Sequence, residues 1–204
     1  MSRILALLFV IATGSSLASA AETVLVFGDS LSAGYGIAVR QSWPSLLAER
    51  LKQEKLPYTV VNASISGETT AGGRSRLPAA LKQHRPAIVI LALGANDGLR
   101  GLPISEARAN LTQMTQAARA SGARVLLAGM RLPPNYGTEY TRDFATLFSA
   151  VAKQEKTALL PFLLEPIAAD DAAFQADRLH PTAAAQPKIL DHVWLSLKPL
   201  LKSH

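Results

Sequence analysis

Residues 87–93 form an unbroken apolar run, Ala-Ile-Val-Ile-Leu-Ala-Leu. A run of this kind is typical of a strand that is buried on both faces of a parallel sheet. Strand-like segments also occur at 23–27, 58–62, 124–130 and 157–161, with helix-like segments between them. This alternation predicts an α/β fold, a three-layer α/β/α arrangement around a five-stranded parallel sheet.

The intervals between the strands carry helix signals. Ser42 is a candidate cap, with Pro44 in the first helical turn that follows. Further helices are expected at 70–83, at 105–121, along the apolar stripe from 140 to 151, and from 182 or 187 to about 200. The pattern is weak at 162–180, where a loop and a short helix are expected. A strand order of 2-1-3-4-5 is the natural choice for so small a sheet, and it gathers the segments that follow the strands along one edge.

The chain has 204 residues, of which 49% are hydrophobic and 18% charged, as expected for one globular domain with a sizeable core. It contains no cysteine. This excludes disulfides, thiolate metal sites, a cysteine nucleophile and a lipid-modified cysteine at the N-terminus.

The first 20 residues have the three parts of a secretory signal: a basic start, an apolar run at 4–13, and a small, polar stretch ending in Ala-Ser-Ala. The apolar run is shorter than the roughly 20 residues that a spanning helix needs, which disfavours the alternative of a membrane anchor. We expect cleavage after Ala20, a single domain over 21–204, and export to the periplasm or beyond. No other segment is long and apolar enough to cross a bilayer.

The formal net charge is +6, but the lysines and arginines are scattered. Scattered cations are typical of solvated helix faces, so we expect no nucleic-acid partner. Weak attraction to anionic lipid headgroups stays open. A monomer is favoured, although the sequence does not determine the oligomeric state.

A serine lies where the first strand, 23–27, gives way to a Gly-rich loop, 28–36. Because ligands bind at the carboxyl ends of strands in open α/β sheets, Ser30 is a candidate nucleophile. No Gly-x-Ser-x-Gly pattern surrounds it, so the nucleophile elbow of the α/β hydrolases is excluded. Ser32 is the competing candidate, which we assign to the loop. A serine in a turn is common, and a catalytic one needs a general base and a carboxylate that orients that base.

His180 follows Asp177 by three residues, a spacing that places both side chains within about one turn of chain. The carboxylate can then bind one ring nitrogen while the other points outward. A plain surface turn is the alternative. A metal ligand is less favoured, because no second histidine or acidic cluster completes a coordination set.

A nucleophilic serine also needs donors for the oxyanion of its tetrahedral intermediate. Gly67 offers a backbone N–H with no side chain to block a substrate, and Asn96 offers a side-chain amide. The alternative for Asn96 is a loop asparagine whose side chain bonds its own backbone. We interpret Asp29 and Asp97 as residues that shape the loops.

Taken together, these residues resemble the four sequence blocks of the SGNH (Gly-Asp-Ser-Leu) hydrolase family. The blocks occur in order over the mature chain as Gly28-Asp29-Ser30-Leu31-Ser32, Gly67, Gly94-x-Asn96-Asp97 and Asp177-x-x-His180. Further stretches resemble the bacterial periplasmic thioesterase I, lysophospholipase and arylesterase branch: 63–67, 96–101, 131–133 and 135–137. Two departures are Ala95, where glycine is frequent, and Arg178, where a small residue is frequent.

The resemblance implies a flavodoxin-like fold and a hydrolase that acts on aryl esters, acyl thioesters and lysophospholipids. It implies a catalytic triad of Ser30, Asp177 and His180, with the oxyanion bound by Ser30, Gly67 and Asn96. It implies no metal and no cofactor. Three alternatives stay open: a carbohydrate O-acetyl esterase, a lipid carrier, and a non-catalytic module that uses 28–36 as an anion loop. The last lacks any Gly-x-x-x-x-Gly-Lys or Gly-x-Gly-x-x-Gly pattern.

Overall fold

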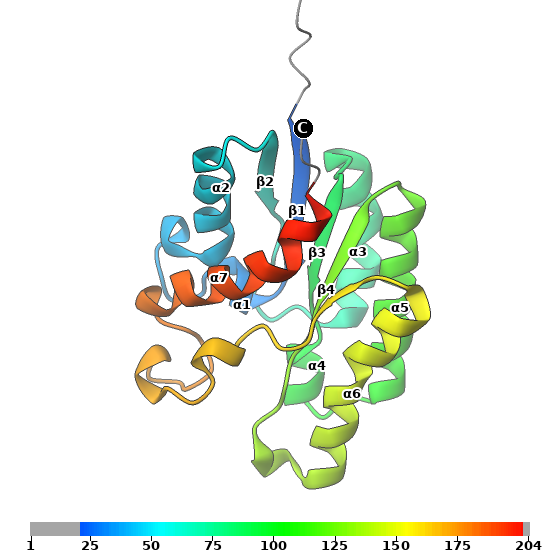
Figure 1. The fold of residues 1–204 in the computed structure, drawn as a ribbon. Helices are drawn as coiled ribbons and strands as arrows, with labels where there is room; N and C mark the ends of the chain where they lie inside the picture. Colours follow the sequence, from blue (N-terminus) through cyan, green and yellow to red (C-terminus); the bar gives the residue numbers. More distant parts are fainter. Residues whose placement is uncertain (1–20, 202–204) are drawn as a thin grey trace, which may run out of the picture.

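The computed structural model describes residues 21–201, which form a five-stranded parallel sheet between two layers of helices (Figure 1). The strand order is β2-β1-β3-β4-β5, which confirms the predicted topology. The strands are β1 (Glu22–Gly28), β2 (Tyr58–Asn62), β3 (Ile88–Ala92), β4 (Arg124–Ala128) and β5 (Ala158–Leu160). The sheet therefore places the ends of β1, β3 and β4 at the middle of one edge.

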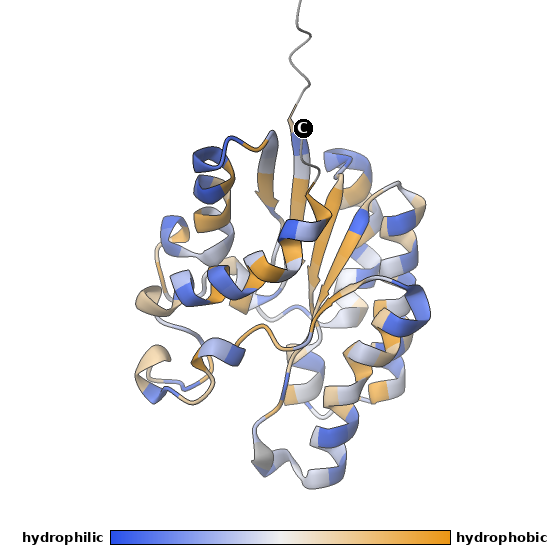
Figure 2. Ribbon diagram, viewed as in Figure 1, coloured by the Kyte–Doolittle hydropathy of each residue, from blue (hydrophilic) through white to orange (hydrophobic). Residues whose placement is uncertain are grey.

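The apolar content of each strand follows its place in the sheet. Every residue of the central strand β3 is buried, as the unbroken apolar run predicts, whereas β2 lies at an edge and is only partly buried. Colouring by hydropathy shows the apolar strands enclosed by helices whose outer faces are polar (Figure 2). The main core thus lies on both faces of β1, β3 and β4.

The helices divide between the two faces. Helices α2 and α7 pack together on one side, and α3, α5 and α6 pack in sequence on the other (Figure 1). The α-helices are α1 (Ser30–Ala33), α2 (Trp43–Gln53), α3 (Thr70–His84), α4 (Ala95–Leu99), α5 (Ile104–Ala120), α6 (Thr138–Glu155) and α7 (Gln186–Leu197). Short 3₁₀ turns are Val39–Gln41, Pro134–Tyr136, Glu165–Ile167, Asp171–Ala173, Ala183–Ala185 and Lys198–Leu200.

The start of α2 corrects one sequence expectation. Ser42 precedes the helix and Pro44 lies in its first turn, but the Ser42 hydroxyl donates to the carbonyl of Val39 (2.7 Å) and does not cap the helix. The backbone N–H of Trp43 donates instead to the side-chain oxygen of Gln186 (2.9 Å), at the start of α7. A buried glutamine from a distant helix thus takes the place of the local cap.

Two segments expected to be loops are helical. The chain forms α1 after β1 and α4 after β3, with lengths of 4 and 5 residues. Helices this short span little more than one turn, so they leave no apolar periodicity in the sequence. Both begin directly at the carboxyl edge of the sheet, and this placement sets the positions of Ser30 and Asn96.

The segment 162–180 forms turns, among them two of the 3₁₀ turns, and an isolated antiparallel bridge between Phe174 and Pro181. The following helix begins at Gln186, which agrees with the later of the two predicted starts. Within residues 21–201 no helix is long and apolar enough to cross a membrane. The predicted signal peptide, residues 1–20, lies outside the described residues.

Candidate active site

Ser30 lies at the first position of α1, directly after the end of β1. The Asp29 carboxylate accepts the Leu31 N–H (3.1 Å) and so caps this helix. At Gly28 a Cβ atom would come within 2.9 Å of both the Ala92 carbonyl and the Ser32 hydroxyl. Only glycine lets the chain pass this close to β3, and this tight passage fixes where the Ser30 side chain emerges.

Ser30, His180 and Asp177, the three residues of the expected triad, form one hydrogen-bonded chain in the structure. The distance from Ser30 Oγ to His180 Nε2 is 2.9 Å, and that from His180 Nδ1 to Asp177 Oδ2 is 2.7 Å. Because a carboxylate can only accept, the imidazole carries its proton on Nδ1. Its Nε2 is then free to accept the Ser30 hydroxyl proton.

The turn that carries Asp177 holds its carboxylate in place. Its Oδ1 accepts the backbone N–H groups of His180 and Leu179, both at 3.0 Å. These bonds, first the one from the His180 backbone and next that from its ring, lower the pKa of Asp177 to about 2. The group is therefore ionised and able to orient the imidazole over the whole neutral range.

Tyr35 is a neighbour of His180 that sequence reasoning missed. Its ring centroid lies 4.4 Å from that of His180, and its exposed fraction is 53%. The Gln175 amide donates to the carbonyls of Tyr35 (2.8 Å) and Pro181 (3.0 Å). The position of Tyr35 between two glycines was the only local signal. Nothing in the sequence links Tyr35 to Gln175, 140 positions later, or to His180.

The proposed oxyanion donors lie on three separate segments. Gly67 has φ +79°, a conformation that favours glycine, and its missing Cβ would have only an Arg100 nitrogen nearby, at 3.7 Å. Within residues 21–201 the backbone N–H groups of Ser30 and Gly67 have no hydrogen-bond acceptor. These two donors are thus available to a substrate.

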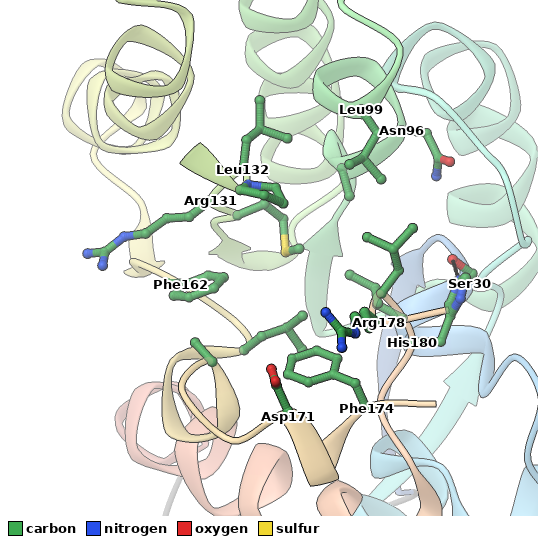
Figure 3. A pocket seen from close by; sticks show the side chains of 17 residues that line it. Ser30, Asn96, Leu99, Arg131, Leu132, Phe162, Asp171, Phe174, Arg178 and His180 are labelled. Carbon is green, nitrogen blue, oxygen red and sulfur yellow. Dashed lines mark hydrogen bonds between the residues drawn. The ribbon is translucent and has the colours of Figure 1, made fainter. Parts of the chain in front are cut away.

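The Asn96 amide nitrogen donates to the Glu68 carbonyl (3.0 Å) and approaches Asp29 Oδ2 (3.5 Å). The alternative in which Asn96 bonds its own backbone does not describe this structure, because the acceptor lies on the loop next to Gly67. The bond joins the Asn96 side chain to the segment that presents the Gly67 N–H. Asn96 also lines the cavity beside Ser30 (Figure 3).

The two aspartates interpreted as loop-shaping residues are both buried. Asp97 accepts from the N–H (2.8 Å) and the hydroxyl (2.5 Å) of Thr70, and it therefore ties α4 to the start of α3. Asp29 lies beneath the site. Burial raises the pKa of Asp29 to about 7, against the lowering effect of the bond from Leu31.

We expect Asp29→Asn to flatten the pH dependence of stability between about pH 4 and 7. The folded protein keeps the Asp29 proton up to a pKa of about 7, whereas the unfolded chain loses it near its usual 3.8. The wild type therefore binds more protons when folded, and its free energy of unfolding falls as the pH rises through this window. The asparagine variant lacks this loss, which is on the order of 4 kcal/mol.

Urea unfolding of both proteins at several pH values measures this difference directly. The two profiles should diverge from pH 4 to 7 and run parallel above pH 8. Profiles that stay parallel throughout would show that the pKa of Asp29 is the same in the folded protein as in the unfolded chain.

Ser32, the competing nucleophile, is fully buried. Its hydroxyl has no hydrogen-bond partner among the described residues. Ser32 lies within α1 and not in a loop, but no substrate can reach this buried oxygen and no base contacts it among the described residues.

A cavity of about 510 Å³ opens beside Ser30 and His180 (Figure 3). Its lining is mainly apolar, with contributions from Leu31, Leu99, Met130, Leu132, Phe162 and Phe174. Leu99 and Leu132 lie in 96–101 and 131–133, two of the stretches that resemble the family branch in sequence. The two phenylalanines were missed, because they lie in the segment 162–180 with no regular pattern. Ala95 and Arg178, the two departures, both line this cavity.

Within the described part of the chain, no three histidine, aspartate or glutamate side chains gather closely enough to hold a metal ion. This edge of the sheet brings together a hydroxyl, an imidazole and a carboxylate in series, beside backbone and amide donors.

Comparison with known proteins identifies a family. The GDSL-like lipase/acylhydrolase family matches residues 26–186, which include every residue of the site described above. The esterase TesA of Pseudomonas aeruginosa is 54% identical over 183 residues, covering 90% of this chain and 91% of the relative. The thioesterase 1/protease 1/lysophospholipase L1 of Escherichia coli K12 is 43% identical over 184 residues, covering 90% and 87%.

Solved structures show the same likeness. A crystal structure of TesA superposes with a TM-score of 0.86 at 53% sequence identity, covering 88% of this chain and 100% of that one. The fold, the order of the sequence blocks and the matched length agree, and the chain belongs to the GDSL-like (SGNH) lipase/acylhydrolase family.

Proposed function

We propose that this protein is a serine esterase that hydrolyses carboxylic esters and thioesters through an acyl-enzyme intermediate. The observation that carries the proposal is the chain from Ser30 through His180 to Asp177, with distances of 2.9 and 2.7 Å, at the mouth of an apolar cavity. A hydroxyl, a base and an orienting carboxylate in this arrangement are the parts that nucleophilic acyl transfer needs.

In the first half of the reaction, Ser30 Oγ attacks the substrate carbonyl carbon while its proton passes to His180 Nε2. Asp177 keeps the imidazole oriented and stabilises its positive charge. The backbone N–H groups of Ser30 and Gly67 and the Asn96 amide bind the oxyanion. When the tetrahedral intermediate collapses, the bond to the alcohol or thiol breaks and His180 returns its proton to that leaving group.

In the second half, a water molecule takes the place of the hydroxyl. His180 accepts a proton from the water as its oxygen attacks the acyl carbon, and the same donors bind the second oxyanion. The bond to Ser30 then breaks, His180 returns the proton to Oγ, and the free acid leaves. Neither half needs an external electron donor or cofactor.

The cavity favours an acyl substrate over a sugar ester. An acyl chain that enters this cavity gains about 0.8 kcal/mol of favourable binding free energy for each methylene group that it removes from water. The named activities of the relatives, esterase and thioesterase/lysophospholipase, fall in the same class. We therefore propose aryl esters, acyl thioesters and lysophospholipids as substrates. We further propose that residues 1–20 direct export to the periplasm and are removed.

A series of p-nitrophenyl esters from acetyl to dodecanoyl, followed by acyl-CoA and a lysophospholipid, tests the proposal. Turnover that rises beyond acetyl supports it. A strict preference for acetyl would favour the carbohydrate O-acetyl esterase. Binding of fatty acids with no turnover of any ester would favour the lipid carrier and contradict the proposal.

We expect Asn96→Ala to lower kcat about 10²–10³-fold, because one of the oxyanion donors is removed. KM for a short aryl ester should change much less, since the oxyanion forms only after attack. Steady-state kinetics, with the urea unfolding curve as a check on folding, measure both. A loss confined to KM or to stability would show that Asn96 only supports its loop.

A further inference from the structure

The apolar cavity beside Ser30 has charged residues in its wall. Arg178 and Asp171 both line it, on the same segment that carries His180. Neither side chain forms a hydrogen bond or an ion pair with any residue between 21 and 201. Both residues are also exposed to solvent. Two unpaired charges of opposite sign therefore line one cavity beside the candidate nucleophile, where water also reaches them.

The Arg178 side chain is directed into the cavity, whereas that of Arg131, another arginine of the lining, points away from it (Figure 3). The Arg131 guanidinium lies over the Phe162 ring, 5.3 Å from its centroid. Arg178 thus presents a cation to whatever enters, two residues along the chain from His180. Its donors are free to form charge-assisted hydrogen bonds with an anionic oxygen.

The backbone at Arg178 has φ +57°, in the left-handed region where glycine is favoured. The other described positive-φ residues that are not glycine, Lys55, Arg85 and Lys156, lie just after helices. Arg178 instead lies in the turn between Asp177 and His180. Since the hydrogen bonds that hold Asp177 go to residues 179 and 180, this turn does not need the arginine side chain.

We propose that Arg178 makes this cavity accept acyl chains that carry an anionic group, such as the monoesters of dicarboxylic acids. This inference rests on the proposed esterase function and names a substrate class for it. The apolar side chains of the cavity disfavour a carboxylate, because a charge that loses part of its hydration does so at a cost in free energy. The free Arg178 guanidinium attracts the anionic group and offsets that cost, whereas the Asp171 carboxylate repels the anionic group and adds to the cost. Arg178 should therefore raise the preference for anionic over neutral acyl chains, and Asp171 should lower it.

Matched pairs of p-nitrophenyl esters test the proposal: butanoate against the succinate monoester, hexanoate against adipate, and octanoate against suberate. Within each pair the number of acyl carbons is equal, and the distal end is a methyl group or a carboxylate. The readout is the ratio of kcat/KM for the anionic ester to that for the neutral one. The series finds the chain length at which the carboxylate reaches Arg178.

At that length, Arg178→Gln should lower the ratio about fivefold, a modest change because an exposed charge pair is screened by water. Arg178→Gly should do the same without risk to folding, because glycine adopts this backbone readily. Arg178→Lys should restore most of the ratio, and Asp171→Asn should raise it. Added salt should reduce the wild-type ratio towards that of Arg178→Gln.

Arg131→Gln is the matched control, since it removes the same charge from the lining but from a side chain that points away. An equal fall in this variant, or no fall at any chain length in Arg178→Gln, would overturn the proposal. The panel is completed by an ester whose hexanoyl chain is uncharged and whose nitrophenyl leaving group carries a carboxylate. Dependence on Arg178 for that ester alone would place the anion on the leaving group and also contradict the proposal.

Binding separates this inference from the proposed function. In the Ser30→Ala background, titration with the adipate and hexanoate esters should show the same dependence on Arg178, without turnover. If the wild type hydrolyses none of the esters, the proposed function fails, while the binding ratio still decides the role of Arg178. An absent preference in both binding and turnover would overturn the inference and leave the esterase function standing.

Discussion

Replacing Ser30 with alanine is expected to lower kcat about 10⁴-fold or more, because the nucleophile is lost and only the binding site and the oxyanion donors remain. The fold should persist. Ser30 is partly exposed, and its hydroxyl bonds only the His180 ring among the described residues. Steady-state hydrolysis of p-nitrophenyl hexanoate measures the loss, and labelling of the wild type by a serine-reactive phosphonate, followed by mass spectrometry, locates the modified residue.

Ser32→Ala is the matched control for this experiment. Its hydroxyl is buried and unpartnered, so its removal leaves no broken hydrogen bond, and we expect activity within about twofold of the wild type. An active Ser30→Ala protein, or a label on Ser32, would remove Ser30 from the mechanism.

The second large effect is expected for Asp177→Asn, with kcat lower by about 10³–10⁴-fold. The asparagine oxygen can still accept the backbone N–H groups of His180 and Leu179 that Oδ1 now accepts. Its amide, however, would donate to Nδ1, and the ring would then carry its proton on Nε2. A protonated Nε2 cannot take the proton of Ser30, so the general base is lost while the turn keeps its shape.

The measurement for Asp177→Asn is the kcat profile against pH, together with the thermal unfolding midpoint. Because Asp177 is 40% exposed in its side chain, the midpoint should barely change. Asp177→Ala serves as the comparison, since it removes the hydrogen bonds to the turn as well as the carboxylate. Full activity in the asparagine variant would show that water can orient His180 in place of the carboxylate.

The strands could be predicted because their physics is local. A parallel strand buried on both faces must be apolar throughout, and 87–93 shows this directly; the order of strands then follows from a small sheet with alternating helices. The residues of the candidate site could be proposed from their positions after the strands together with the resemblance to the SGNH family. Ser30, Gly67 and Asn96 each follow a strand, and Asp177 and His180 are three residues apart.

The contacts of the base could not be predicted in the same way. Tyr35 and His180 meet across 145 positions of sequence, through loops without periodicity. Gln175 lies between them: its side-chain amide donates to the Tyr35 carbonyl, and its backbone N–H donates to the His180 carbonyl. The cavity wall formed by Phe162 and Phe174 depends on short 3₁₀ turns, whose residues show no apolar stripe. The direction of the Arg178 side chain depends on a left-handed turn, which a sequence with arginine at that position does not suggest.

The segment from 162 to 180 contributes both to the triad and to the cavity wall, and this limits how the substrate specificity of the enzyme can change. It carries His180 and Asp177, the proposed base and orienting carboxylate, and it also supplies Phe162, Phe174 and Arg178 to the cavity. A substitution on this side of the cavity can therefore move His180 as well as reshape the wall. The opposite side, with Leu99 and Leu132, comes from segments that hold neither triad partner. Substitutions on that opposite side can change the specificity for acyl chains while the distances among Ser30, His180 and Asp177 stay fixed.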